Sequence, residues 1–158
     1  MKNINTSKWA EFKLSELGFL CHHGKRLSNK ERIEGNICFI TAGKEKQGIG
    51  GYIGNNVDTF EKSITVDMFG NCFYHQEACG GDDNVYFFVN DKLPESIKLF
   101  LASSINSDLK DKYSYAHQFR QKDADSLKVK LPAMNKYTPD WHRLNELTNC
   151  KFGGGYMI

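Results

Sequence analysis

Few residues in this chain combine the types and the spacing that metal chemistry needs. Cys72, His75 and Cys79 are close enough in sequence to share a zinc ion, which prefers thiolate and imidazole ligands. A tetrahedral site needs a fourth ligand, and no Cys-x-x-Cys or His-x-x-x-His pair supplies one. Cys72 also falls in an apolar stretch that is typical of a strand. We therefore predict that these residues are structural and that the chain holds no metal.

Carboxylates that could support hydrolysis occur at Asp82, Asp83 and Asp140. A metal-dependent nuclease places such groups beside a lysine, but no Glu-x-Lys or Asp-x-Lys follows Asp140 in this sequence. The sequence contains no recognisable cysteine-nucleophile motif, no Gly-Lys-Ser or Gly-Lys-Thr phosphate loop and no βαβ glycine signature for a nucleotide cofactor. We predict no catalytic residue and no cofactor, and we keep a small nuclease as the alternative enzyme hypothesis.

Two glycine-rich segments carry side chains that could contact DNA, and these side chains are Lys25, Arg26, Lys44, Lys46 and Gln47. The first two follow Gly24, where a flexible backbone and paired cations could grip a phosphate. The others lie in segment 43–51, whose four glycines allow close approach of the backbone to a ligand. A glutamine amide such as that of Gln47 suits bidentate contact with adenine. A solvated surface turn explains either segment about as well.

Segment 110–122 gives the strongest indication of DNA contact, because cations, rings and amides alternate there with few aliphatic residues. Its predicted contacts are Lys112, Tyr113, Tyr115, Gln118, Arg120, Gln121 and Lys122, and the same run contains Lys110 and His117. Cations would position the duplex on its phosphates, while Gln47, Gln118, Arg120 or Gln121 would read base edges. A solvated loop is the alternative interpretation.

The elements that position these segments are predicted from apolar periodicity. Short strands are expected at 19–21, 37–41, 52–53, 63–68, 72–74, 84–89 and 129–131. Helical spacing of Ile97, Phe100 and Leu101 predicts one main helix at about 93–106. This order predicts an α+β fold: a single compact domain with a mixed or antiparallel sheet of short strands, one main helix and a short C-terminal helix.

Capping and turn residues predict how the elements begin and end. Ser28 and Glu31 have the spacing of a capping box, so one helical turn is expected at 29–33. Asp140 is expected to cap the C-terminal helix. Gly80-Gly81-Asp82 is expected to form a turn, and Pro132 is expected to end the last strand.

Composition limits the class of protein. The 158 residues fit one domain, which we expect over 1–150 with a flexible tail over 151–158. A net charge of +2 does not by itself indicate nucleic-acid binding, but it excludes the heavily acidic surface of a DNA mimic. The five cysteines show no regular spacing, no apolar run approaches the roughly 18 residues of a membrane span, and the N-terminus lacks a signal-peptide pattern. We therefore expect a cytoplasmic protein with no membrane contact.

The order of short motifs along the chain resembles the target recognition domains of type I restriction-modification specificity subunits. The matching residues are Trp9 with Phe12-Lys13-Leu14 and Leu17; Gly24-Lys25-Arg26-Leu27; Gly35 with Ile37 and Phe39-Ile40-Thr41-Ala42; Gly48-Ile49 with Gly51-Tyr52-Ile53; Ile64-Thr65-Val66; Gly70-Asn71 with Cys72-Phe73-Tyr74; Asp82-Asp83-Asn84-Val85; Leu131-Pro132; and Pro139-Asp140-Trp141. Each motif alone is common, and their order is the specific signal.

This resemblance implies a non-enzymatic domain that reads one half of a split double-stranded DNA target. Methylation and cleavage would belong to separate methyltransferase and restriction subunits, and a homodimer is a further candidate assembly. Members of the family carry two such domains joined by long helices, which this sequence lacks. A third hypothesis is a protein-interaction module that has lost DNA binding and docks through the face of Ile97, Phe100 and Leu101.

Overall fold

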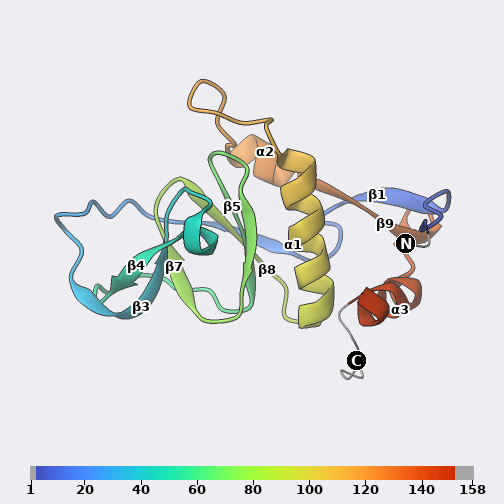
Figure 1. The fold of residues 1–158 in the computed structure, drawn as a ribbon, viewed down its shortest axis with the longest axis horizontal. Helices are drawn as coiled ribbons and strands as arrows, with labels where there is room; N and C mark the ends of the chain where they lie inside the picture. Colours follow the sequence, from blue (N-terminus) through green and yellow to red (C-terminus); the bar gives the residue numbers. More distant parts are fainter. Residues whose placement is uncertain (1–2, 152–158) are drawn as a thin grey trace.

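The computed structural model describes residues 3–151, with the backbone alone for residues 150 and 151 (Figure 1). Its strands are β1 (Trp9–Lys13), β2 (Leu20–His23), β3 (Glu34–Ile40), β4 (Ile49–Ile53), β5 (Ser63–Asp67), β6 (Cys72–His75), β7 (Cys79–Gly81), β8 (Val85–Val89), β9 (Lys128–Asn135) and β10 (Thr138–Pro139). Its helices are the 3-10 helix η1 (Glu45–Gly48), α1 (Glu95–Leu109), α2 (Gln121–Asp125) and α3 (Trp141–Lys151). The expected tail, apart from the Lys151 backbone, lies outside the described residues.

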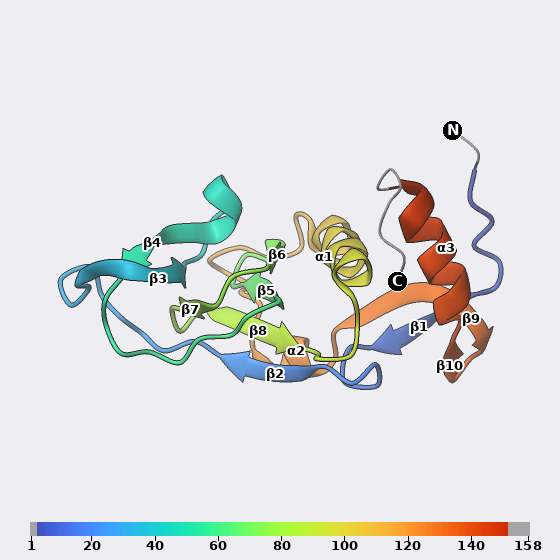
Figure 2. The same cartoon turned by 90° about the horizontal axis from the view of Figure 1, so that it is seen from below.

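Three small sheets form the framework, which confirms the predicted α+β class with antiparallel and mixed pairing. The central sheet is antiparallel in the order β2-β8-β5-β6. A second sheet, β4-β3-β7, is mixed because β3 and β7 run parallel. The third, β1-β9-β10, is antiparallel and lies with α3 at the opposite end of the molecule from β3 and β4 (Figure 2). Helix α1 lies between the two ends, beside the central sheet.

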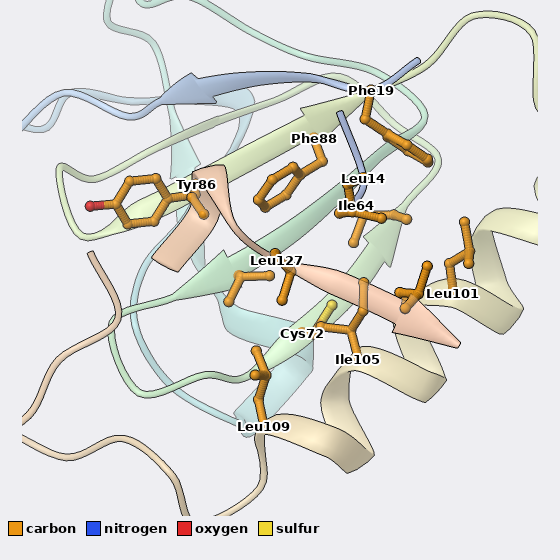
Figure 3. Packing of buried hydrophobic residues seen from close by; sticks show 14 of the residues in the cluster. Leu14, Phe19, Ile64, Cys72, Tyr86, Phe88, Leu101, Ile105, Leu109 and Leu127 are labelled. Carbon is orange, nitrogen blue, oxygen red and sulfur yellow. The ribbon is translucent and has the colours of Figure 1, made fainter. Parts of the chain in front are cut away.

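The main core forms where α1 packs on the central sheet (Figure 3). Ile97, Leu101 and Ile105 recur at four-residue spacing along one helix face and are almost fully buried. Ile64 and Val66 alternate along β5 and bury their side chains in the same cluster. Burying one such side chain stabilises the fold by roughly 1.5–3 kcal/mol, so this face fixes α1 firmly on the sheet.

The face of Ile97, Phe100 and Leu101 is therefore not available for docking a partner. Ile97 and Leu101 belong to the core, and Phe100 is partly buried against it, with its ring 6.3 Å from that of Trp9. The hypothesis of a protein-interaction module that docks through this face is wrong, because the helix uses the face to hold its own domain together.

A smaller core lies on the other side of β5. It consists of Cys38, Ile40, Cys79, Val85 and Phe87, and Ile49 and Phe60 pack against it. The alternate residues of β5, Ser63 and Thr65, are buried but polar. The Thr65 hydroxyl makes a hydrogen bond to the ring of buried His75, with Oγ1 at 3.1 Å from Nε2. Strand β5 is thus covered on both faces.

Four local predictions are wrong. Residues 29–31 form a hydrogen-bonded turn and not the helical turn expected at 29–33. The Glu31 carboxylate does accept hydrogen bonds from the N–H and the hydroxyl of Ser28. Gly80 and Gly81 belong to strand β7, where the missing side chain lets the Phe87 ring approach Gly81 closely. Strand β4 begins at Ile49, inside the expected loop.

Strand β9 also continues past Pro132 to Asn135. Pro132 has no N–H to donate, and opposite it Trp9 donates its own N–H to Thr6 rather than across the ladder. The Pro132 carbonyl accepts from the Asp140 N–H at 2.8 Å. The helix cap predicted at Asp140 is confirmed, since its Oδ1 accepts from the Arg143 N–H at 3.0 Å.

Candidate nucleic-acid interface

Most loops that carry the predicted DNA contacts leave the sheets at one end, which we call the loop end. In the central sheet, β2 ends at His23 opposite Tyr86, near the start of β8. Strand β5 ends at Asp67, opposite Val85. Strands β3 and β7 run parallel and finish together at this end. The connections 24–33, 41–48, 68–71 and 82–84 therefore leave from the same side of the molecule.

Asp67 fixes two of these connections to each other. Its side chain is 3% exposed, and it accepts hydrogen bonds from the Gly43 N–H at 2.8 Å and the Phe69 N–H at 2.9 Å. It also accepts from the backbone and side-chain amides of Asn71 at 3.0 and 2.9 Å. One buried carboxylate thus positions loop 41–48 beside turn 68–71, which the sequence reading did not anticipate.

Segment 110–120 passes across the same end after α1, where it projects as a loop (Figure 1). The Phe119 N–H donates to the Met68 carbonyl at 2.8 Å, and the Phe119 side chain is 1% exposed. The Tyr113 ring packs edge-on against Phe119 at 5.3 Å and stacks on His117 at 5.3 Å. Burial raises the pKa of the Tyr113 hydroxyl, which keeps it neutral. Tyr113 is therefore mainly an anchor for the loop.

Tyr115 differs from Tyr113 because it is 78% exposed to solvent. Its ring makes a T-shaped contact with the ring of Phe69, from turn 68–71, at a centroid distance of 5.0 Å. An exposed aromatic side chain on a well-fastened loop is a suitable contact group for a ligand.

A hollow of about 410 Å³ lies between these loops. Its lining residues come from four segments and are Lys44, Phe69, Gly70, Asn71, Phe73, Asn106, Lys110, Asp111 and Tyr113. Lys44 and Lys110, far apart in sequence, meet at this hollow, with one carboxylate, Asp111, among them. Sequence reasoning missed Phe69 and Asn106; the Gly70-Asn71 turn after a buried strand was the available signal.

Lys46 and Gln47 form the tip of loop 41–48. Both are exposed, and both have left-handed backbone angles, with φ of 49° and 57°. Side chains rarely adopt this conformation, which costs of order 1 kcal/mol or more per residue. Strained residues of this kind concentrate at binding sites, because the surrounding structure must hold them. Here the Thr41 N–H closes the loop on the Gly48 carbonyl at 2.8 Å.

Lys25 and Arg26 lie at the loop end but further along the connection from β2 to β3. Gly24 passes so close to the backbone of Gly81 and Asp82 that no other residue fits. Exposed Lys25 forms a 3.6 Å ion pair with exposed Asp58, and such pairs contribute little and are easily exchanged. Arg26 is exposed as well.

The remaining predicted contacts lie in segment 110–120 and in α2, and they differ in whether they make hydrogen bonds within the domain. Arg120 precedes α2, and its N–H donates to the Asp123 carboxylate at 2.9 Å. The Gln121 amide donates to Asp125 at 2.8 Å, and the Gln118 amide donates to the Tyr115 carbonyl at 3.4 Å. Lys112 and Lys122 are exposed. Gln47 is thus the predicted amide that makes no side-chain hydrogen bond within the described residues.

Two of the three carboxylates of the nuclease hypothesis, Asp82 and Asp140, have structural partners. Asp82 accepts from the N–H groups of Leu27 and Asp83 and pairs with Arg32 at 3.8 Å. Asp140 caps α3 in another part of the fold. Within residues 3–149, the group that could hold a metal contains neither of them. The trio Cys72, His75 and Cys79 is also not assembled, because Cys72 lies in the main core and Cys79 in the smaller one.

Comparisons with known proteins point to one kind of domain. A family model described as the type I restriction modification DNA specificity domain matches residues 6–152. The specificity subunit S.BcgI of a type II restriction enzyme from Heyndrickxia coagulans is 25% identical over 152 residues, which are 92% of this chain and 44% of that protein. The chain therefore spans less than half the length of this relative.

Solved structures with the same fold are also specificity subunits. The S subunit of a type I restriction-modification system from M. genitalium superposes with a TM-score of 0.65 at 20% identity, covering 92% of this chain and 40% of that one. The HsdS subunit from Thermoanaerobacter tengcongensis gives a TM-score of 0.55 at 14% identity, covering 94% and 38%. These likenesses show a shared fold.

Proposed function

Since the chain belongs to the family of type I restriction modification DNA specificity domains, we propose that it binds double-stranded DNA and recognises a base sequence through its loop end. The domain would supply target recognition to a restriction-modification assembly. It would leave methylation and cleavage to other subunits.

The observation that carries this proposal is the convergence of separate segments on the hollow at the loop end. Lys44 and Lys110 line it, and Lys46 and Lys112 are exposed on the segments that carry them. Cations in such an arrangement bind the phosphate backbone, which supplies most of the affinity without reading sequence. The net charge of +2 does not reveal this local grouping of lysines, which includes two acidic residues, Glu45 on loop 41–48 and Asp111 at the hollow.

Base reading falls most naturally to Gln47 and to the region around Tyr115. The Gln47 amide is free at a loop tip and has the donor and acceptor that adenine recognition needs. Arg120, which the sequence also predicts to read bases, supplies a guanidinium, a group suited to bidentate contact with guanine. Gln121 is less suited, because its amide is held by Asp125.

We place methyltransferase and restriction subunits as the partners of this domain. One structural neighbour, with a TM-score of 0.62 at 15% identity, comes from a study of complex assembly in the type I restriction-modification system. A homodimer is the second assembly to test, by light scattering with and without DNA. None of the helices within residues 3–151 has the length and apolar character that a bilayer crossing requires. We propose that the protein works in the cytoplasm, where its DNA substrate lies.

Repeated selection of bound duplexes from a random pool at low salt tests this function. We expect enrichment of one short sequence and a binding constant that falls steeply with salt. Retention of DNA without any enriched sequence would contradict target recognition. Incubation of the purified chain with plasmid and magnesium tests the nuclease alternative. Cleavage of the plasmid without other subunits would favour a nuclease.

A further inference from the structure

Two buried thiols face each other across the parallel strands of the mixed sheet. Cys38 on β3 and Cys79 on β7 are directly paired in register, so their side chains lie on the same face of the sheet. They are 1% and 0% exposed, and the Cys79 thiol donates to the Glu77 carbonyl at 3.5 Å. The pairing brings together cysteines that the sequence places on distant strands.

A tyrosine and a carboxylate extend this pair into a row across the sheet. Tyr52 on β4 is the register partner of Cys38, so Tyr52, Cys38 and Cys79 are successive neighbours across β4, β3 and β7. Glu77 precedes β7, and its carboxylate accepts from the Tyr52 hydroxyl at 3.4 Å. The ligand atoms of Cys38, Glu77 and Cys79 all lie within 4.8 Å of one another.

We propose that Cys38, Cys79 and Glu77 form a binding site for a thiophilic divalent cation, with zinc as the best fit. Two thiolates and one carboxylate are ligands that zinc accepts in a tetrahedral arrangement. Ligands of one such ion lie about 3.6–3.8 Å apart, given zinc–sulfur bonds of about 2.3 Å and zinc–oxygen bonds of about 2.1 Å at the tetrahedral angle. Small side-chain rotations would close the present group to that size. The Tyr52 hydroxyl would orient the carboxylate from outside.

Binding at this site is a ligand exchange without redox chemistry. Each thiol loses its proton to solvent as the metal–sulfur bond forms, so one ion releases two protons. Water fills the fourth position. The ion would join β3 to β7 and, through Glu77 and Tyr52, to β4.

The proposed role of the ion is to stabilise the strands that carry the recognition loops. Strand β3 leads directly into loop 41–48, and β7 leads into turn 82–84. The metal site itself is formed by other residues than the proposed DNA contacts, so it stands or falls independently of the proposed function. This proposal departs from the sequence-based prediction that the chain holds no metal.

Titration of the whole chain with Co²⁺ under reducing conditions tests the site. We expect one Co²⁺ per chain, with the thiolate-to-cobalt charge-transfer absorption of a tetrahedral site, and displacement by Zn²⁺. Cys38→Ser and Cys79→Ser should abolish this absorption. Glu77→Gln should weaken binding about tenfold or more, and Tyr52→Phe by a smaller factor.

Cys21→Ser is the matched control, because Cys21 lies on β2 outside the cluster, and it should bind Co²⁺ like the wild type. Since a buried cysteine variant could fail to fold, circular dichroism of each apo variant is recorded first. Glu77 is exposed, so Glu77→Gln should leave the core intact. This variant therefore tests the site even if the cysteine variants do not fold. Absence of thiolate–cobalt absorption in the wild type, wild-type affinity in Glu77→Gln, or loss of absorption in Cys21→Ser would each overturn the proposal.

Discussion

Two tyrosines with nearly equal exposure allow the proposed interface to be tested at single residues. Tyr115 is 78% exposed at the loop end, while Tyr137 is 77% exposed beside the β9–β10 pair. We expect Tyr115→Ala to weaken DNA binding by about 1 kcal/mol, or about fivefold, because a large contact surface is lost. Tyr137→Ala should have no effect. Fluorescence anisotropy with one labelled duplex measures both, and equal losses would place the interface elsewhere.

The lysines at the hollow should contribute to the salt dependence of DNA binding. Lys44→Ala and Lys110→Ala should each weaken binding by roughly 1 kcal/mol and reduce the slope of log K against log salt by about one, since each removes one phosphate contact. Lys128→Ala is the control, because this exposed lysine lies on β9. Binding isotherms at several salt concentrations give the slopes. An unchanged slope in both hollow variants would mean that neither lysine contacts phosphate.

Buried His75 makes the stability of the domain depend on pH. Burial lowers its pKa from 6.5 to about 4, so the folded state holds the ring neutral while the unfolded chain takes up a proton below pH 6.5. Stability should therefore fall between pH 6.5 and about 4, by on the order of 3 kcal/mol from this group. Urea unfolding at a series of pH values measures the effect. His75→Asn should flatten the dependence in this window, and an unchanged dependence would assign it to other groups.

Residue types alone identified several of the exposed side chains at the loop end, but not which side chains anchor a loop and which face solvent. Cations and amides without an apolar pattern predicted a surface segment at 110–122, and Lys112, Tyr115 and Lys122 are exposed there. Tyr113 serves largely as an anchor because Phe119, an apolar residue within the segment, gives it a partner. The contact between Phe119 and Tyr113 depends on the path of the loop, so the sequence pattern does not indicate that Tyr113 packs inward.

At the scale of elements, Asp67 is the residue that holds the recognition loops in place. Asp67→Ala would leave the N–H groups of Gly43, Phe69 and Asn71 without their acceptor. We expect a loss of about 2 kcal/mol or more in unfolding free energy and a larger proportional loss of DNA binding, because the loops lose their geometry. Chemical denaturation measures the loss of stability, a DNA-binding titration measures the loss of affinity, and hydrogen exchange at Gly43 reports whether loop 41–48 has come loose.

Asp123→Ala is the matched control for Asp67→Ala. Asp123 accepts from the Arg120 N–H at the start of α2, so it also holds a local turn through a carboxylate, but it does not fasten loop 41–48. We expect it to destabilise the domain less and to leave exchange at Gly43 unchanged. Full DNA binding by Asp67→Ala would contradict the positioning role.

The elements themselves were largely predictable, and the exceptions share a physical cause. Alternation of apolar residues located β5 and β8, and helical spacing located α1 to within a turn at either end. Strand β7 was missed because Cys79–Gly81 contains two glycines, whose lack of side chains is what admits Phe87. The parallel pairing of β3 with β7 joins distant segments, so no local pattern indicates it. The Cys38 and Cys79 pair was hidden for the same reason.

At the scale of the whole molecule, topology converts scattered motifs into one surface. Antiparallel pairing in the central sheet and parallel pairing of β3 with β7 direct loops from distant parts of the sequence to one end. The third sheet and α3 lie at the far side of α1 from β3 and β4 (Figure 2). The fold thus places the third sheet and α3 apart from the two strands that are joined by loop 41–48.

The central claim is that this loop end recognises a DNA sequence, and comparative selection tests it most directly. Random duplexes are selected at low salt with the wild type, with a Gln47→Ala variant and with Lys128→Ala. We predict one enriched sequence for the wild type and Lys128→Ala, and relaxed preference at one base pair, by about 1–3 kcal/mol, for Gln47→Ala. The same enriched sequence, with equal preference at every position in all three proteins, would contradict base reading by Gln47 at the loop end. No enrichment by any of them would contradict sequence recognition itself.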